Sequence, residues 1–338
     1  MGLTEKVAPR GTRRRKLAAG LARKVRPDRT PPPPPPVVRR ENRTLKESWA
    51  DKDPNALENY LVSGFQNPQV NAQSIIARHH LIRQLFGNRY EDLMRAELEH
   101  CVEATKALRR RAKELDVRMG SFLKDHKRAG VLEVSEVIAD WQDTYEKEWA
   151  AALADRKAKP LSVLEFACGS ANDYRYFDSY GIARFLDYTG VDLNDKNVAN
   201  ARRRFPTVNF EVGSVLHLPH KSRSFDYVVA FDIFEHLSLE AMEQAVREAC
   251  RLAKKGMVLT FFSMVDEPEH MVRPRRKYFW NRLSMPKVRE LVGESFASIE
   301  VMKIRDLMND EFGFPYSYNK NAWTFIPGAS SRSGPQAG

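Results

Sequence analysis

From residue 158 onward, short apolar and β-branched runs alternate with segments whose apolar residues recur every three or four positions. Runs of the first kind are typical of buried strands, and segments of the second kind are typical of amphipathic helices. Seven strands are predicted, at residues 162–167, 188–192, 208–212, 226–231, 257–262, 298–304 and 322–326. Alternation of strands with helices predicts an α/β fold built on a mostly parallel, seven-stranded sheet with right-handed crossovers.

Two of the intervening helices have recognisable ends. One is predicted to begin at Asn194 and to end on the arginines at 202–204. The other is predicted to begin after Ser238 and to end at the Lys-Lys-Gly sequence of residues 254–256. Asn and Ser are common N-caps, and cations followed by Gly are common at helix C-termini.

Residues 41–157 have helical periodicity and are expected to form a helical cap region. One apolar face comprises Met94, Leu98, Cys101, Thr105 and Leu108, and another comprises Val134, Val137, Ile138, Trp141, Tyr145 and Trp149. Such faces dock helices on a neighbouring domain, although one of the aromatic rings could also wall a substrate cavity. His79 and His80 point about 100° apart on a helix, so core or surface positions suit them better than a shared metal ion.

The net charge of +11 is concentrated at the N-terminus. Residues 1–40 hold 12 Lys and Arg against 2 Asp and Glu, so the rest of the chain is nearly neutral. This segment also contains six consecutive prolines, at 31–36, and few apolar residues. Such composition cannot repay the entropy of ordering, so we expect a disordered basic tail at 1–40 and a flexible C-terminus at 329–338.

Several classes of protein are disfavoured by composition. No run approaches the roughly 18–20 apolar residues of a membrane helix, and the apolar stretch at 17–22 is too short for a secretion signal. The three cysteines are scattered along the sequence and form no C-x-x-C motif, so neither a disulfide framework nor a metal site is predicted. These features favour a cytoplasmic protein.

The first strand leads into the most informative motif of the chain. It contains Glu165, and the turn that follows contains Gly169. The second strand ends in Asp192, and an acid there suits the hydroxyls of a ribose. A dinucleotide site would need G-x-G-x-x-G, of which only Gly169 is present, and Glu165 would repel a phosphate. The acid instead suits S-adenosylmethionine, which carries a sulfonium and an ammonium group.

Residues 161–263 resemble the class I S-adenosylmethionine-dependent methyltransferases, specifically the small-molecule group that includes the quinone-biosynthesis enzymes (methyltransferase type 11). The resemblance rests on five segments in the family's order, namely 165–169, Asp192, 213–219, 224–229 and 234–237. Ala167 and Ala171 replace two glycines of the family pattern, and Ser214 replaces its usual Asp. The resemblance implies a Rossmann-like methyltransferase domain at 158–328.

The resemblance also implies a set of residues that bind S-adenosylmethionine. These are Glu165, Ala167, Gly169, Asp192, Leu193, Ser214, Val215, Phe231 and Asp232. Within this set, Glu165 is expected near the methionyl amino group, Asp192 at the ribose, Ser214 and Val215 at the adenine, and Phe231 and Asp232 near the methionine. His236 is the candidate catalytic residue, either as a general base or in a binding and structural role.

The acceptor is expected to contact an insertion at 264–283. Its mixture of cations with Tyr278, Phe279 and Trp280 suits an anionic or sugar-like molecule, and an amphipathic surface helix is the competing interpretation. The predicted function is O- or N-methylation of a small molecule, such as a glycan or natural product. One alternative is a nucleic-acid methyltransferase recruited by the tail, against which the neutral body argues. Another is a methyltransferase-like binding module without turnover, suggested by the missing glycines.

Overall fold

The computed structural model describes residues 72–114, 144–276, 278–315 and 321–328. The predicted basic tail at 1–40, the C-terminus at 329–338 and the apolar face at 134–141 lie outside these residues. All the described residues belong to one compact unit.

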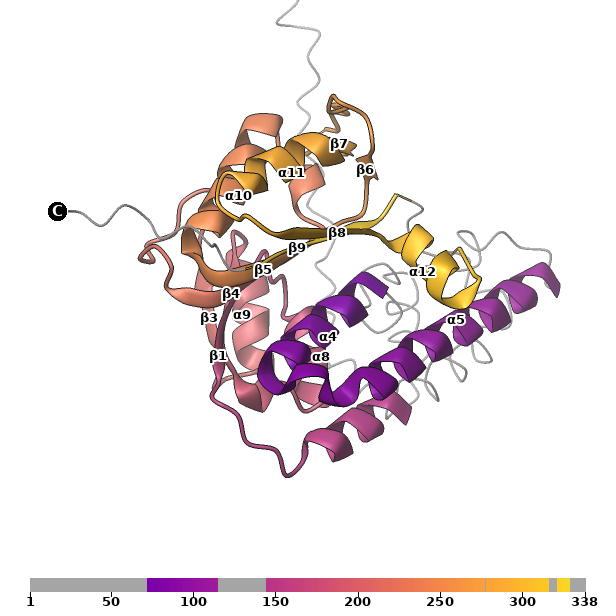
Figure 1. Ribbon diagram of the computed structural model, residues 1–338. Helices are drawn as coiled ribbons and strands as arrows, with labels where there is room; N and C mark the ends of the chain where they lie inside the picture. The colour runs from indigo at the N-terminus through magenta and orange to yellow at the C-terminus, as the bar shows by residue number, and fades with distance from the viewer. Residues whose placement is uncertain (1–71, 115–143, 277, 316–320, 329–338) are drawn as a thin grey trace, which may run out of the picture. The chain divides into compact units, whose positions relative to one another are not determined.

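A seven-stranded sheet with the order β3-β2-β1-β4-β5-β9-β8 forms the centre of this unit (Figure 1). Its strands are β1 (Leu161–Phe166), β2 (Leu186–Asp192), β3 (Asn209–Val212), β4 (Phe225–Phe231), β5 (Ala253–Phe261), β8 (Ile299–Lys303) and β9 (Trp323–Pro327). Only β9 is antiparallel to its neighbours. The seven predicted strands and the mostly parallel α/β sheet are confirmed.

The strand order reverses at β1, which pairs with β2 on one side and with β4 on the other. In open α/β sheets a crevice forms at such a point, beyond the carboxyl ends of the strands. Residues that follow β1, β2 and β4 are therefore brought together, although they are far apart in the sequence.

Helices surround the sheet. They are α4 (Ala72–Phe86), α5 (Glu91–Glu114), α8 (Asn172–Ser179), α9 (Asp195–Arg204), α10 (Leu239–Leu252), α11 (Met285–Gly293) and α12 (Ile304–Phe312), and residues 144–153 are also helical. The short 3₁₀ segments are η2 (Gly87–Tyr90), η3 (Ala183–Phe185) and η4 (Phe234–His236). Both predicted N-caps form, because Asn194 accepts from the Lys196 N–H and Ser238 accepts from the Ala241 N–H.

The predicted end of α10 is wrong. The helix ends at Leu252, and β5 begins at Ala253 and already includes Gly256. A Cβ at Gly256 would lie 2.5 Å from the carbonyl oxygen of Pro327 and 3.1 Å from the ring of Tyr227. This glycine therefore permits a close approach of backbones within the sheet, where the sequence pattern suggested a helix C-cap.

Two apolar clusters cover the two faces of the sheet. Val163 and Val229 belong to the cluster that includes residues of α4, α5, α8, α9 and α12. Their strand neighbours Leu164 and Val228 belong to the cluster that includes residues of α10 and α11. Because successive strand residues point to opposite faces, the helices form one layer on each side (Figure 1).

The N-terminal helices are also joined to the sheet by polar contacts. Gln73 in the first turn of α4 donates from Nε2 to the carbonyl oxygens of Phe261, at 3.0 Å, and Trp323, at 2.8 Å. Trp149 is fully buried, as its predicted apolar face requires. His79 is buried beside Glu97, and is therefore in the core, which is one of the two positions expected for it. Among the described residues, no helix is long and apolar enough to cross a membrane.

Candidate functional site

The turn between β1 and α8 has an unusual backbone. Ala167, Gly169 and Ala171 all have positive φ angles, of 53°, 55° and 63°. Glycine adopts positive φ angles readily, whereas alanine does so at an energetic cost. Ala167 and Ala171 occupy positions where the family pattern has glycine. A Cβ built at Gly169 would meet nothing within 4 Å, so the space beside this residue is open.

Asp192 connects this turn to β2. Its Oδ2 accepts from the Gly169 N–H at 2.9 Å, and its Oδ1 accepts from the Asn194 N–H at 2.8 Å and from Asn197 Nδ2 at 3.1 Å. Asp192 is thus a buried cap for the turn and for the start of α9. Oδ2 has one acceptor position left, because a carboxylate oxygen can accept two hydrogen bonds.

Glu165 points into the same region from within β1. It is 1% exposed, and its Oε2 accepts from the Tyr188 hydroxyl at 2.7 Å. Burial and the charges of Asp173 and Asp192 raise the pKa of Glu165 well above its usual range, although the Tyr188 hydrogen bond opposes the shift. A cation bound beside this carboxyl group would stabilise its ionised form and so oppose the shift.

Two further acids extend the cluster to the tip of β4. Burial and the charge of Asp232 raise the pKa of Asp173, in the first turn of α8, to about 7, with Arg175 opposing. Burial raises the pKa of Asp232 to about 6, although its Oδ1 accepts from Thr260 Oγ1 at 3.0 Å. Asp232 is another residue with a positive φ, of 52°.

Glu235 completes the set. It is fully buried, and its Oε1 accepts from the Ser263 N–H at 2.9 Å, whereas its Oε2 has no hydrogen-bond partner. Burial and Asp232 raise the pKa of Glu235 well above its usual range. Among the described residues, no salt bridge reaches Glu165, Asp232 or Glu235. The tips of β1 and β4 therefore hold three buried acids that form no salt bridge within the described part of the chain.

The remaining predicted cofactor residues lie around this cluster. The Gly213 N–H donates to the Asp192 carbonyl oxygen at 3.0 Å, which brings the loop containing Ser214 and Val215 to the tip of β2. Ser214 Oγ accepts from the Leu216 N–H, and Val215 is buried in the apolar core. Leu193 is 75% exposed and Phe231 is half-buried. None of these four side chains makes a contact that by itself assigns a ligand.

The insertion at 264–283 contains a β-hairpin. Its base is a small parallel pair of β6 (Met264–Val265) and β7 (Leu283–Ser284). Met271 and Arg282 exchange two backbone hydrogen bonds, and the Arg275 N–H donates to the Tyr278 carbonyl oxygen at 2.7 Å. The surface-helix interpretation of this segment is wrong, because its described residues form strand-like pairs.

The hairpin packs on η4, directly after β4. His236 Nδ1 lies 3.1 Å from the carbonyl oxygen of Phe279. The imidazole ring has its centroid 5.2 Å from Phe262, 5.5 Å from Tyr278 and 5.7 Å from Trp280. Since a carbonyl oxygen only accepts hydrogen bonds, Nδ1 must carry the proton, and in the neutral ring Nε2 keeps its lone pair.

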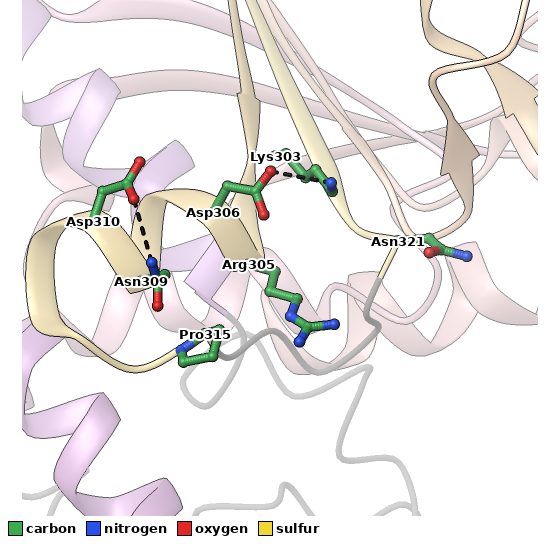
Figure 2. A pocket seen from close by; sticks show the side chains of 7 residues that line it. All are labelled: Lys303, Arg305, Asp306, Asn309, Asp310, Pro315 and Asn321. Carbon is green, nitrogen blue, oxygen red and sulfur yellow. Dashed lines mark hydrogen bonds and ion pairs between the residues drawn. The ribbon is translucent and has the colours of Figure 1, made fainter.

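A cavity of about 620 Å³ lies beside α12 and β8, the last strand in the sheet order (Figure 2). Its lining residues are Lys303, Arg305, Asp306, Asn309, Asp310, Pro315 and Asn321, and Lys303 pairs with Asp306 at 3.0 Å. Small-molecule sites are usually lined by apolar groups, and this lining is polar. Residues 316–320 lie outside the described chain, so we assign no function to this cavity.

Sequence reasoning missed four polar residues of the site, namely Asp173, Tyr188, Glu235 and Thr260. Asp173 looks like an ordinary acid in a helix first turn, and the others look like members of strands or of the E-H motif. A signal existed for Asp173 and Glu235, because each is an acid within a few residues of a strand tip. Their mutual proximity depends on the strand order, which the sequence pattern alone did not give.

Residues 163–256 match the family model described as a methyltransferase domain. A probable S-adenosylmethionine-dependent methyltransferase of Mycolicibacterium smegmatis is 34% identical over 28% of this chain and 35% of its own length. A probable chloroplastic tocopherol O-methyltransferase of rice is 28% identical over 47% of this chain and 43% of its own. A tRNA (carboxymethyluridine(34)-5-O)-methyltransferase of Saccharomyces cerevisiae is 24% identical over 36% and 43%, respectively.

Among solved structures, 1,6-didemethyltoxoflavin-N1-methyltransferase of Burkholderia thailandensis, with its substrate and S-adenosylhomocysteine bound, aligns with a TM-score of 0.39. It is 16% identical and covers 56% of this chain and 78% of its own. The chain spans between about a third and two fifths of the length of the curated relatives it matches. The matched segment, which carries the turn, the acids and the strand tips described above, is a methyltransferase domain of the class I, S-adenosylmethionine-dependent type.

Proposed function

We propose that this protein binds S-adenosylmethionine and transfers its methyl group to a small-molecule acceptor. The observation that carries the proposal is the set of buried acids Glu165, Asp232 and Glu235 at the tips of β1 and β4, none of which forms a salt bridge with another described residue. A dinucleotide would bring phosphates to these acids, whereas the sulfonium and ammonium groups of S-adenosylmethionine have the complementary charge.

The residues present fit this cofactor in two further respects. The open space beside Gly169 gives a ligand access to bare backbone. Asp192 has an acceptor position to offer a ribose hydroxyl, and exposed Leu193 follows it directly, as an apolar cover for adenine. Ser214 and Val215 remain our proposal for the adenine side. Ala167, Phe231 and Asp232 remain our proposal for the methionine side.

S-adenosylmethionine supplies a methyl group that is already activated by its sulfonium. The protein's own contribution is therefore mainly to hold the acceptor in line and to exclude water, and such alignment can supply about 7–11 kcal/mol. In our proposal, His236 and the rings of Phe262, Tyr278 and Trp280 border the acceptor. The lone pair of His236 Nε2 can take a hydrogen bond or a proton from the acceptor, because Phe279 fixes the proton on Nδ1.

Two other functions have some support. A nucleic-acid acceptor is favoured by the similarity to the yeast tRNA enzyme and by the basic segment at 1–40, and the nearly neutral remainder of the chain argues against it. A binding module without turnover is suggested by Ala167 and Ala171. The retained Glu165, Gly169 and Asp192 argue against that alternative.

Calorimetry with S-adenosylhomocysteine tests the cofactor proposal. We expect binding by the wild-type protein, weakened in Glu165→Gln, with NAD giving no heat. Glu300→Gln, an exposed acid of β8, is the matched control and should bind as tightly as the wild type. Binding of NAD without a response to S-adenosylhomocysteine would refute the proposal.

Release of S-adenosylhomocysteine in the presence of a small-molecule library or of tRNA then distinguishes the acceptor classes. If neither the library nor tRNA leads to release, the binding module is favoured.

A further inference from the structure

The hairpin of residues 271–282 combines exposed apolar side chains with positive charge. Six large apolar side chains are more than a third exposed among the described residues, and four of them belong to this hairpin. These are Met271 (41%), Val272 (49%), Tyr278 (46%) and Trp280 (39%). The other two, Leu193 and Val212, lie elsewhere on the chain. Exposed apolar residues concentrated in this way indicate a surface that meets another body.

The charge of the hairpin is of one sign. Residues 271–282 contain four arginines and one lysine and no acid. Arg273, Arg275 and Arg276 are exposed, and no salt bridge joins them to another described residue. The acids of this region, Asp266, Glu267 and Glu269, precede the hairpin at its base, and Glu269 pairs with Lys287. The hairpin itself is therefore basic and apolar, and the exposed acids are confined to the segment 266–269 that precedes it.

The backbone pairing fixes how these side chains are arranged. The Trp280 N–H donates to the Arg273 carbonyl oxygen at 2.8 Å, and Arg275 pairs with Tyr278. Directly opposed residues of an antiparallel pair lie on the same face, so Arg273 shares a face with Trp280 and Arg275 shares a face with Tyr278. Trp and Tyr rings prefer the headgroup level of a bilayer, and cations beside them suit anionic headgroups.

We propose that this hairpin docks the protein on an anionic phospholipid bilayer, with Met271, Val272, Tyr278 and Trp280 entering the interface and the arginines contacting the headgroups. A nucleic acid would also attract the arginines and aromatic rings, but it offers nothing to exposed Met271 and Val272, which favour acyl chains. Because Tyr278 and Trp280 also contact His236, docking would place the acceptor side of the domain at the bilayer. An acceptor that partitions into membranes follows from this, and that corollary alone rests on the proposed methyltransferase function.

A fluorescent probe at the hairpin tests the docking. The three native cysteines are all buried, so a thiol-reactive nitrobenzoxadiazole dye can be attached selectively to Val272→Cys in the full chain. We expect a blue shift and a gain in intensity with vesicles containing phosphatidylglycerol, and little change with phosphatidylcholine alone. The same dye on Ser224→Cys, exposed at the opposite edge of the sheet before β4, is the matched control and should not respond.

The charge contribution is tested by sedimentation with the same vesicles. Arg275→Gln with Arg276→Gln should weaken partitioning roughly thirtyfold, since each cation at an anionic surface contributes about a fivefold factor. Lys221→Gln with Lys254→Gln removes equal charge from exposed positions near the amino ends of β4 and β5, and should have a much smaller effect. This pair controls for attraction by the basic segment at 1–40, which both double variants retain.

Three results would overturn the docking proposal. The first is vesicle binding with no response of the dye at position 272, as expected if the basic segment alone recruits the protein. The second is an equal response at 272 and 224. The third is a response at 272 to single-stranded RNA but not to vesicles, which would identify a nucleic-acid surface. If vesicles shift the dye and S-adenosylhomocysteine does not bind, docking stands and the proposed function fails.

Discussion

Glu97 and Glu165 are both almost completely buried, but they differ in their hydrogen-bond partners and in the direction of their pKa shifts. Glu97, in α5, accepts hydrogen bonds from Arg78 and, at 2.7 Å each, from His79 Nε2 and Trp149 Nε1. Burial alone would raise the pKa of Glu97, but Arg78 and these hydrogen bonds lower it below the usual range. Glu165 has one neutral donor, Tyr188, and acids for neighbours, and its pKa is raised.

The difference separates a structural acid from an acid that fits a ligand. Glu97 is compensated by the fold itself, and it ties α4, α5 and the helix at 144–153 together. The Arg78 guanidinium also stacks on the ring of Tyr180, 3.8 Å from its centroid, which extends this network to the end of α8. Glu165 is left without a counter-charge, so an incoming cation would gain most at that position.

The largest effect that follows from this contrast is on folding. Glu97→Gln should lower the free energy of unfolding by about 3–5 kcal/mol, because it leaves the buried Arg78 guanidinium without its partner. Glu165→Gln should change it by less than about 1 kcal/mol, because the amide oxygen of Gln can still accept from the Tyr188 hydroxyl and no buried cation loses its partner. Urea denaturation of the two variants measures both. Equal losses of stability would show that the two glutamates have the same role.

Asp192 lies between these two cases, because the fold already satisfies it and it also belongs to the proposed site. Asp192→Ala should weaken S-adenosylhomocysteine binding about ten- to a hundredfold, since a hydrogen bond to a charged group contributes about 1.5–3 kcal/mol. It should also lower stability by about 1–3 kcal/mol, because the Gly169 and Asn194 N–H groups lose their acceptor. Calorimetry and urea denaturation separate the two effects. A loss of stability without a loss of affinity would make Asp192 a structural cap only.

The same residues show how much of this arrangement can be predicted from the sequence. Strand periodicity gave the seven strands, and the short motifs named Glu165, Gly169 and Asp192, since both signals are local. The partners of Glu97 come from two other helices, α4 and the helix at 144–153, and nothing in the spacing of Arg78, Glu97 and Trp149 indicates that they meet. The proximity of Asp173 and Glu235 to the other acids likewise depends on strand order, and the basic hairpin resembled a surface helix because its composition suits both structures.

His236 tests whether the site relies on alignment more than on proton transfer. His236→Ala should lower turnover by less than the roughly 10²–10⁴-fold expected on loss of a general base, since the ring also packs against three aromatic side chains. His236→Gln is the comparison, because it keeps a polar side chain of similar reach. Steady-state kinetics on an identified acceptor gives the answer. A steeper loss that recovers at high pH would establish His236 as the base.

The raised pKa values predict a pH dependence with a definite sign. Asp173 and Asp232 titrate near 7 and 6 when folded and near 3.8 otherwise, so the folded state binds more protons between these values. The stability they contribute is present below about pH 4 and is lost as the pH rises through about 6–7. Ionised acids bind a cation better, so the affinity for S-adenosylmethionine relative to S-adenosylhomocysteine should rise about tenfold between about pH 5 and 8. Calorimetry at both pH values checks this, and a constant ratio would exclude these acids from the sulfonium side.

The smallest effect concerns backbone strain, which also distinguishes the two regions. Of the four described non-glycine residues with positive φ, Ala167, Ala171 and Asp232 lie at the strand tips of the proposed site, and none lies in α4 or α5. An alanine held in the left-handed region costs about 1–2 kcal/mol. Glycine removes this strain, but it also raises the conformational entropy of the unfolded chain, which destabilises the folded state by about 0.4–1 kcal/mol. Ala167→Gly should therefore raise the free energy of unfolding by up to about 1 kcal/mol. Gly169→Ala, at φ 55°, should lower it by a similar amount. Ala171→Gly should be nearly neutral, because its methyl group is fully buried and is lost from the core. Urea denaturation of the three variants resolves these signs, and a destabilised Ala167→Gly would mean that the turn is held without strain.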